Sequence, residues 1–188
     1  MCHGVNIKNI KISVFLKKTN LVKTAIREFV QDQNIEKRNP SFFIYRSDFV
    51  YTIFFSGHIN CTKIKSYNDI NTAVKNILDK FGLNYNNILK LQIDNILAVG
   101  RISYFICLQS FGHFLQSKGI QVQYNPQRFP GLCIKKSPSS SLTFLSGKVI
   151  LTGIKSETEL KHSWNFFKQL YYEYCRMPSF SKMANMGL

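Results

Sequence analysis

A stretch of turn and strand occurs twice in this chain, and the repetition constrains the fold more than any other sequence feature. The stretch LSGKVILTG at 145–153 has a degraded counterpart, FSGHINCTK, at 55–63. Three other blocks recur in the same order: KNIKISV at 8–14 with DNILAVG at 94–100, RNPSFFIYR at 38–46 with RFPGLCIKK at 128–136, and the segments 66–82 and 156–172. A spacing of about 90 residues exceeds the period of solenoid repeats, so the pattern predicts a duplicated domain.

Each copy is predicted to contain a strand, a helix, three or more further strands and a second, longer helix. In the later copy Ser156 and Glu159 form an S-x-x-E capping box at the start of this helix. In the earlier copy we expect Ser66 to cap the helix and Gly82 to end it. The apolar stripes, which predict core faces, are Leu160, Trp164, Phe167 and Tyr171 in the later copy and Ile70, Val74, Ile77 and Phe81 in the earlier one.

The strand segments at 41–45, 49–57 and 149–153 are apolar on both faces instead of alternating with polar residues. Two long and two short helices can cover one face of such a sheet but hardly two, so one apolar face should stay uncovered, bordered by Lys and Arg. Three outcomes are open: closure into a barrel, burial in a dimer, or contact with a ligand that is both apolar and anionic. A DNA minor groove is such a ligand.

The net charge of +15, from 25 Lys and Arg against 10 Asp and Glu, favours a polyanionic partner, either nucleic acid or an anionic membrane. The simpler interpretation is charge for solubility alone. No apolar run is long enough for a membrane span, and the N-terminus has no signal-peptide core, so we expect an intracellular protein and no membrane partner.

The cysteines and histidines do not form a recognisable metal or disulfide pattern. Five widely spaced cysteines are typical of reduced, mostly buried thiols, and Cys2-His3 is a dipeptide without a second pair. We therefore expect no structural metal and no cofactor. The cysteines are Cys2, Cys61, Cys107, Cys133 and Cys175, and the histidines are His3, His58, His113 and His162.

The motifs NPQRFPGL (125–132) and LTFLSGKVILTGIKS (142–156) resemble the second half of the core of the TATA-box-binding protein family. IKNIKISV (7–14) and FFSGHINCTKIKS (54–66) resemble its first half. The resemblance implies an α+β TBP-like saddle: two pseudo-symmetric repeats form one curved antiparallel sheet, with helices on the convex face and DNA on the concave face. It divides the chain into a first repeat at 1–88, a second at 89–176 and a C-terminal tail at 177–188.

The resemblance implies DNA-facing residues throughout the second repeat. Phe129 and Phe144 match the pair that wedges between base steps, a role that suits a flat apolar ring. Asn95 and Thr152 match polar residues at the centre of the groove floor. The apolar floor residues are Leu97, Leu142 and Ile150, and the lysines expected to meet phosphates are Lys135, Lys148 and Lys155. An apolar floor favours A·T pairs, because it would bury the amino group of guanine without a partner.

The first repeat departs from the family pattern. Asn9, Phe54, Thr62 and Lys65 fit it. Lys11 and Asn60, however, stand where the family has apolar residues of the groove floor, the first of them small. His58 stands in place of a lysine, and Lys63 in place of the glycine that follows the threonine. The second wedge should fall near Asn39 or Pro40. Pro40 itself, or Phe42 through a register shift, are the candidates, and Arg46 completes the expected DNA-facing set. We therefore expect a relaxed A·T preference and a reduced kink at this end, with simple drift as the alternative for each substitution.

These features predict a non-enzymatic, general transcription initiation factor that binds and bends AT-rich promoter DNA in the minor groove and recruits other factors and RNA polymerase. The alternative is a divergent platform protein with weak or relaxed DNA binding. An enzyme needs paired carboxylates or a nucleophile motif, and the sequence has neither. The turn that docks a factor of the transcription factor IIB type carries Asn125, Gln127 and Arg128 where the family has acids, which predicts an altered partner. We expect action in the nucleus, or at the site of viral transcription.

Overall fold

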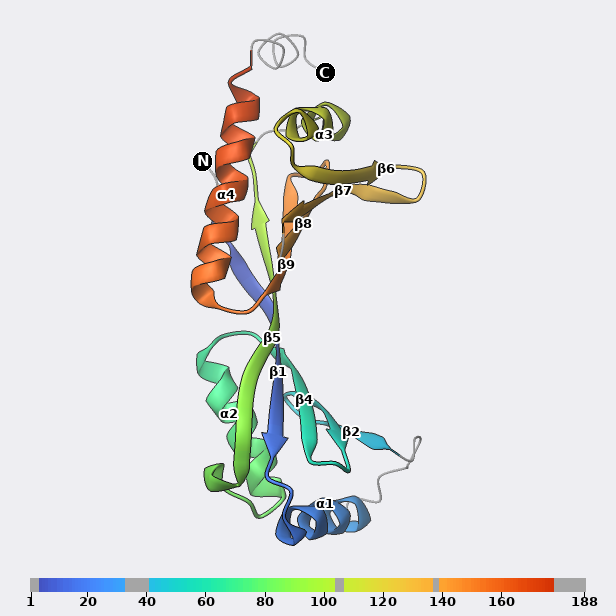
Figure 1. The fold of residues 1–188 in the computed structure, drawn as a ribbon, viewed down its shortest axis with the longest axis vertical. Coiled ribbons are helices and arrows are strands. Elements are labelled where there is room, and N and C mark those ends of the chain that lie inside the picture. Colours follow the sequence, from blue (N-terminus) through green and yellow to red (C-terminus); the bar gives the residue numbers. More distant parts are fainter. Residues whose placement is uncertain (1–3, 33–40, 104–106, 137–138, 178–188) are drawn as a thin grey trace. The chain divides into compact units, whose positions relative to one another are not determined.

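The computed structural model describes residues 4–32, 41–103, 107–136 and 139–177. It contains the predicted order of elements twice (Figure 1). The first set is β1 (Asn6–Leu16), α1 (Asn20–Asp32), β2 (Phe42–Arg46), β3 (Val50–Phe54), β4 (His58–Ile64) and α2 (Asn68–Lys80). A short turn, η1 (Tyr85–Asn87), leads to the second set: β5 (Ile88–Arg101), α3 (Leu108–Ser117), β6 (Gln121–Asn125), β7 (Phe129–Lys136), β8 (Ser139–Thr143), β9 (Lys148–Ile154) and α4 (Glu157–Cys175).

The strands are hydrogen-bonded in the order β2-β3-β4-β1-β5-β9-β8-β7-β6. The pairs β2–β3, β3–β4, β4–β1, β6–β7, β7–β8 and β8–β9 are antiparallel. The order begins at β2 and ends at β6, so the sheet does not close into a barrel. Residues 7–96 form one compact unit, and the segment beginning at Leu97 forms most of the other. The α+β class with antiparallel pairing is therefore confirmed.

The expectation of a longer second helix is confirmed in the second repeat, where α3 has 10 residues and α4 has 19. It is wrong in the first repeat, where α1 and α2 have 13 residues each. The reason lies in the sequence after α2. α2 ends at Lys80 with Phe81 as its C-cap, and Gly82 then takes the left-handed conformation, with φ 61°, which stops the helix.

Both predicted helix caps form, with a difference in the later one. In the first repeat Ser66 Oγ accepts a hydrogen bond from the Asp69 amide, and the Asp69 carboxylate accepts one from the Ser66 amide. In the second repeat Ser156 Oγ accepts from the Glu159 amide at 3.1 Å. The Glu159 carboxylate, however, accepts from the amide of Lys155 instead of that of Ser156, so the return bond of the capping box falls one residue earlier.

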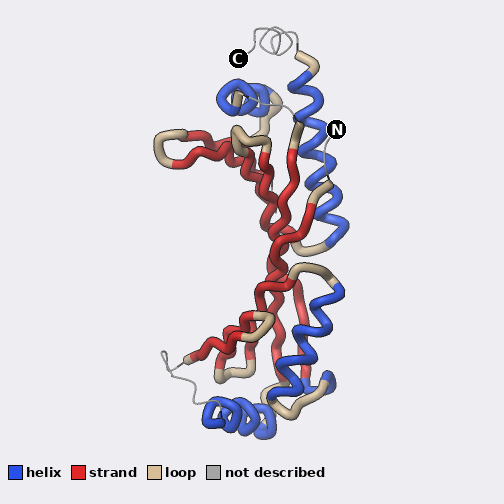
Figure 2. The backbone as a smooth tube through the Cα atoms, turned by 180° about the vertical axis from the view of Figure 1, so that it is seen from behind, coloured by secondary structure: helices blue, strands red, loops and turns tan. Residues whose placement is uncertain are grey.

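The core of the first unit lies between one face of its sheet and both of its helices (Figure 2). Phe29 of α1 contacts Phe43 of β2 with ring centroids 6.2 Å apart, and it meets Phe81 after α2 edge-on at 5.1 Å. Tyr51 of β3 donates a hydrogen bond to the carbonyl of Ala73 in α2. Of the predicted stripe, Val74, Ile77 and Phe81 are buried and Ile70 is half-buried.

The core of the second unit is aromatic where α3 and α4 meet. Phe111 of α3 contacts Phe167 and Tyr174 of α4. Trp164 stacks on Phe167 with centroids 5.8 Å apart and lies directly against Gly100 of β5, where an added Cβ would be 2.5 Å from the indole ring. The whole predicted stripe of α4 is buried, namely Leu160, Trp164, Phe167 and Tyr171.

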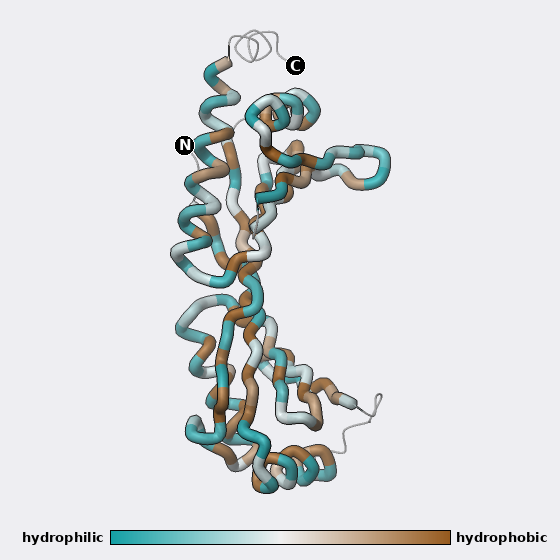
Figure 3. The backbone as a smooth tube through the Cα atoms, viewed as in Figure 1, coloured by the Kyte–Doolittle hydropathy of each residue, from teal (hydrophilic) through white to brown (hydrophobic). Residues whose placement is uncertain are grey.

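Burial alternates along the strands, which means that the helices of each unit cover one face of its sheet. In β3 Tyr51 and Ile53 are buried, whereas Val50, Thr52 and Phe54 are half-buried. In Figure 3 hydrophobic and hydrophilic residues alternate along the strands of each unit. We call the helix-free side the open face of each unit. The expectation of strands that are equally apolar on both faces holds only in part, because the open face of the first unit carries a polar row beside an aromatic one.

Candidate nucleic-acid interface

The open face of the second unit has an apolar row at its centre. The pairing register sets Cys133 of β7 beside Leu142 of β8, and Leu142 beside Ile150 of β9. All three side chains are half-buried. The next row on the same face contains Lys135, Ser140 and Thr152. An apolar strip with a polar margin is therefore present where the sequence predicts a groove floor.

Phe129, which is exposed, and Phe144, which is half-buried, form an edge-on pair at the end of this face. Their ring centroids are 5.8 Å apart, with an angle of 69° between the rings. Gly131 lies beneath the two rings, since an added Cβ would be 2.6 Å from Phe129 Cε1 and 3.0 Å from Phe144 Cε1. Phe129 is 43% exposed, so its ring is available for contact with a ligand. Glycine at 131 is thus what allows the pair to form.

The other predicted residues of the second repeat are exposed or half-buried. Lys135, Lys148 and Lys155 are exposed. Asn95 and Leu97 are half-buried on β5, as Thr152 is on β9. These side chains and the apolar row together provide apolar contacts flanked by positive charge.

The open face of the first unit has polar side chains in the equivalent row. Ile44 of β2 lies beside Thr52 of β3, Thr52 beside Asn60 of β4, and Asn60 beside Ser13 of β1. Phe42, Phe54, His58 and Phe15 form a second row, which is aromatic. His58 is stacked between Phe15, at 4.5 Å and 1°, and Phe54, at 5.1 Å and 10°.

The register of β2 corrects the alignment of the two copies. The sequence blocks place Phe42 opposite Leu132, but Phe43 pairs with Ile53 just as Leu132 pairs with Thr143. Phe42 therefore occupies the position of Gly131, one residue away from the sequence alignment, and its ring lies 5.5 Å from that of Phe54. This shift does not bring Phe42 to the position of Phe129, so its role as a wedge stays a prediction. Asn39 and Pro40 lie outside the described residues.

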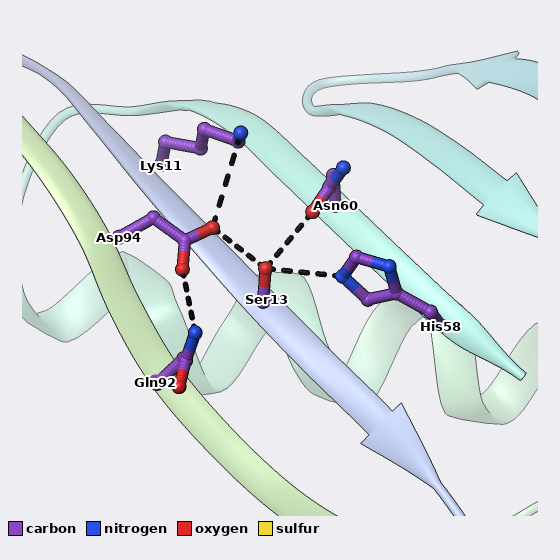
Figure 4. A network of polar contacts seen from close by, with 6 residues as sticks. All are labelled: Lys11, Ser13, His58, Asn60, Gln92 and Asp94. Carbon is purple, nitrogen blue, oxygen red and sulfur yellow. Dashed lines mark hydrogen bonds and ion pairs between the residues drawn. The ribbon is translucent and has the colours of Figure 1, made fainter.

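Six side chains on β1, β4 and β5 form one polar cluster on this open face (Figure 4), with the helices behind the strands. Ser13 Oγ lies 2.6 Å from Asp94 Oδ2, 2.9 Å from Asn60 Oδ1 and 3.1 Å from His58 Nε2. Gln92 donates a hydrogen bond to Asp94 Oδ1 at 2.9 Å, and Lys11 Nζ lies 3.9 Å from Asp94 Oδ2. We call Lys11, Ser13, His58, Asn60, Gln92 and Asp94 the Ser13–Asp94 cluster.

Sequence reasoning found Lys11, His58 and Asn60 but missed Ser13, Gln92 and Asp94. Ser13 could have been predicted from the sequence, because it follows Lys11 by two residues and so lies on the same face of the strand. Asp94 could not have been predicted in this way. Along β5 Ile96, Ala98 and Gly100 are buried, and simple alternation from them places Asp94 on the covered face. Its hydrogen bond to Ser13 places it on the open face instead. His58 contacts Ser13, Phe15 and Phe54, and no sequence pattern indicated these contacts.

The cluster contains the residue types of a hydrolytic triad, but their order is unsuitable for nucleophilic catalysis. In a triad histidine lies between the nucleophile and the carboxylate and takes the hydroxyl proton. Here Ser13 lies between His58 and Asp94, and its side chain is only 3% exposed. Within the described residues there is also no group of three His, Cys, Asp or Glu side chains that could hold a metal ion.

Asn9 and Lys63 are joined near the start of β1. The Lys63 amide donates a hydrogen bond to Asn9 Oδ1 at 2.7 Å, which leaves the Asn9 NH₂ group as a donor. Over the described ranges Lys63 is the one non-glycine residue with a positive φ, 70°. Its counterpart Gly153 has φ 78°. The first repeat therefore keeps the left-handed backbone conformation of the family glycine, although a lysine has replaced the glycine.

The remaining predicted residues are at the surface or at half-buried positions. Arg46 and Lys65 are exposed, and Thr62 is half-buried on β4. Asn125, Gln127 and Arg128 lie in the exposed turn between β6 and β7, closed by a hydrogen bond from the Arg128 amide to the Asn125 carbonyl.

The described cysteines, Cys61, Cys107, Cys133 and Cys175, are free thiols. Burial raises the pKa of the Cys61 thiol to about 12. None of the helices found in the described ranges has the length and apolar character that crossing a membrane requires. Cys2, His3 and nearly all of the C-terminal tail lie outside the described residues.

These features define a class: a duplicated α+β domain whose helix-free sheet face combines apolar, aromatic and basic side chains. The family model described as transcription factor TFIID, or TATA-binding protein, matches residues 4–82 and 90–174. The chain therefore belongs to the TATA-binding protein family, a family of DNA-binding transcription factors and not of enzymes.

The similarity extends over most of the chain. This chain is 31% identical to the TATA-box-binding protein of Sulfurisphaera tokodaii over 164 residues, which cover 83% of this chain and 80% of the relative. With the TATA-box-binding protein of Pyrodictium occultum the identity is 32% over 174 residues, covering 85% and 82%. The solved structure of Methanococcus jannaschii TBP matches the fold with a TM-score of 0.71 at 24% identity, over 91% of this chain and 99% of that one.

Proposed function

We propose that this transcription initiation factor binds promoter DNA in the minor groove through the open faces of its sheet and bends it. The observation that carries the proposal is the edge-on pair of the exposed Phe129 and the half-buried Phe144 on the same face as the apolar row of Cys133, Leu142 and Ile150. A ring pair of this kind inserts between base steps and replaces part of the lost stacking. The family is itself the standard example of this mode of binding.

The side chains of the second repeat favour A·T pairs. Leu142 and Ile150 offer no acceptor, so a guanine amino group against them would lose its hydrogen bond to water. Lys135 and Lys148 are exposed beside this row and are suited to phosphate oxygens. Asn9 presents its NH₂ group, because Lys63 occupies its oxygen. Purine N3 and pyrimidine O2 on the groove floor are acceptors for such a donor.

A bending assay tests the proposal. Duplexes carrying an element obtained by in vitro selection, and scrambled duplexes, are labelled at both ends, and energy transfer reports the end-to-end distance. We expect the selected duplex alone to be bent, and Phe129→Ala with Phe144→Ala to lose most of the bend. Equal affinity for both duplexes without bending would refute the proposal.

We also propose that the exposed turn at Asn125, Gln127 and Arg128 binds an initiation factor of the transcription factor IIB type with an altered surface, and thereby recruits RNA polymerase. Arg128 is positive where the family is acidic, so a standard factor loses charge complementarity. Arg128→Glu should increase the amount of an archaeal factor of this type that joins the protein–DNA complex. No change in ternary complex formation would contradict this role.

The polar open face of the first repeat favours a second candidate function, a platform that holds DNA weakly and acts chiefly through protein partners. The same bending assay separates the two, since a platform protein would bind selected and scrambled duplexes alike. Either function places the protein where the genome is transcribed, and we propose the nucleus or the site of viral transcription.

A further inference from the structure

Two acceptor oxygens of the Ser13–Asp94 cluster, one on Asp94 and one on Asn60, compete for the single hydroxyl proton of Ser13. Ser13 has one hydroxyl proton, yet Oγ lies 2.6 Å from Asp94 Oδ2 and 2.9 Å from Asn60 Oδ1. A hydroxyl donates one hydrogen bond, and a carboxylate is a stronger acceptor than an amide oxygen. With the proton directed to Asp94, the amide oxygen of Asn60 is left to accept from outside the cluster.

Asp94 has further capacity of its own. Its side chain is 21% exposed, and each carboxylate oxygen offers about two lone-pair positions. Gln92 fills one position on Oδ1 and Ser13 one on Oδ2. Lys11 Nζ, 3.9 Å from Oδ2, offsets the negative charge. This balance allows a carboxylate to face DNA, whose phosphates would repel an uncompensated anion.

Acceptor oxygens with positions left match one base pair in the minor groove. A·T and T·A pairs present only acceptors on the groove floor, whereas a G·C pair adds a donor, the 2-amino group of guanine. The second repeat lacks these acceptors, because its residues equivalent to Asn60 and Ser13 are Ile150 and Val99. The two open faces therefore differ in the base pair that each can accommodate.

We propose that Asn60 and Asp94, bridged by Ser13, accept hydrogen bonds from the 2-amino group of guanine, so that the first repeat recognises a G·C pair in the minor groove. The inference rests on the proposed minor-groove binding and specifies the base pair at one end of the element. Aromatic stacking of His58 between Phe15 and Phe54 holds the neighbouring side chain of the cluster in place.

The first arm of the test changes only the DNA. The full chain is titrated against duplexes in which one base pair at a time, along a selected element, is G·C or inosine·C. Inosine lacks the 2-amino group and is otherwise guanine. In a second series 2,6-diaminopurine·T replaces A·T and adds the same group. At one end of the element we expect the 2-amino group to strengthen binding about tenfold, and at the other end to weaken it.

The second arm assigns the effect to residues. Asn60→Ala and Asp94→Ala should each bring the ratio of G·C to inosine·C affinity close to one at the end where it was high. Ile150→Ala, the matched change in the second repeat, should lower overall affinity and leave that ratio unchanged. Thermal unfolding of each variant checks that the sheet is intact, and the DNA arm needs no variant at all.

Two results would overturn the inference while leaving DNA binding in place. One is equal affinity for G·C and inosine·C at every position of an element that the protein still binds and bends. The other is a ratio that survives in both alanine variants, which would mean that the cluster only holds β1, β4 and β5 together. Absence of specific binding to any duplex would overturn the proposed function as well.

Discussion

The open faces of the two repeats share a backbone but not a chemistry. The row of Cys133, Leu142 and Ile150 in the second repeat corresponds to Ile44, Thr52 and Asn60 in the first, with matching pairing registers. The covered faces remained apolar in both, because a folded sheet must bury them against helices. The open face is free of that requirement. Its side chains can diverge without loss of the fold, so they report on the ligand.

The largest expected difference between the repeats concerns their aromatic pairs. Phe144 meets an exposed Phe129 edge-on, whereas its counterpart Phe54 is held between Phe42 and His58. We expect Phe144→Ala to weaken DNA binding by about 2–3 kcal/mol, roughly 30- to 150-fold, because a wedge is lost. Phe54→Ala should cost less than about tenfold. Fluorescence anisotropy titrations measure both, and equal losses would mean that both repeats wedge alike.

Core packing provides the next comparison. Gly100 and Trp164 of the second repeat correspond in sequence to Val14 and Val74 of the first, a large–small pair against two medium side chains. Gly100→Ala should destabilise the protein by about 1–3 kcal/mol, since its Cβ would lie 2.5 Å from the indole. Urea denaturation measures the change.

A double variant controls for this explanation. Gly100→Val with Trp164→Val recreates the first-repeat pair and should be more stable than Gly100→Val alone. If the double variant were the less stable of the two, contact between these two positions would not be the cause of the loss.

Alkaline pH should destabilise the core of the first repeat through Cys61. Burial raises the pKa of the Cys61 thiol from 9.0 to about 12, and burial likewise raises the pKa of Tyr51. Above about pH 9 the unfolded chain loses the Cys61 proton while the folded chain keeps it, so stability falls between about pH 9 and 12. At pH 10 the loss from Cys61 is about 1 kcal/mol.

The second repeat offers the control for this effect, because Leu151 and Ser141 occupy the equivalent positions. Cys61→Leu should lose less stability than the wild-type protein between pH 8 and pH 10 in urea denaturation. Identical losses in the two proteins would exclude Cys61 as a source of the pH dependence.

The smallest expected effect concerns the residue that follows Thr62 in the first repeat and Thr152 in the second. Lys63 has φ 70°, a conformation that costs a residue with a Cβ about 1 kcal/mol relative to glycine. Lys63→Gly should therefore stabilise the protein by up to about 1 kcal/mol, whereas Gly153→Ala should destabilise it by a similar amount. Thermal denaturation checks both, and a stabilising Gly153→Ala would contradict the explanation.

Much of this molecule was predictable because its signals are local. Ser66 and Ser156 cap their helices where expected, Gly82 ends α2, and the stripe through Trp164 is buried. Hydrogen bonds to the nearest turn and helical periodicity depend on residues only a few positions apart, so a single sequence contains them.

The sequence by itself determined the duplication, the order of elements, the family and the wedge pair of the second repeat. Only the tertiary structure decided the chemistry of the first repeat. Phe42 takes the place of Gly131 because strand pairing, not residue count, sets the register. Asp94 reaches Ser13, 81 positions away in the chain, because β1 and β5 are neighbours in the sheet. Contacts between strands that are distant in sequence leave no periodic signal, and here they create the acceptor-rich cluster.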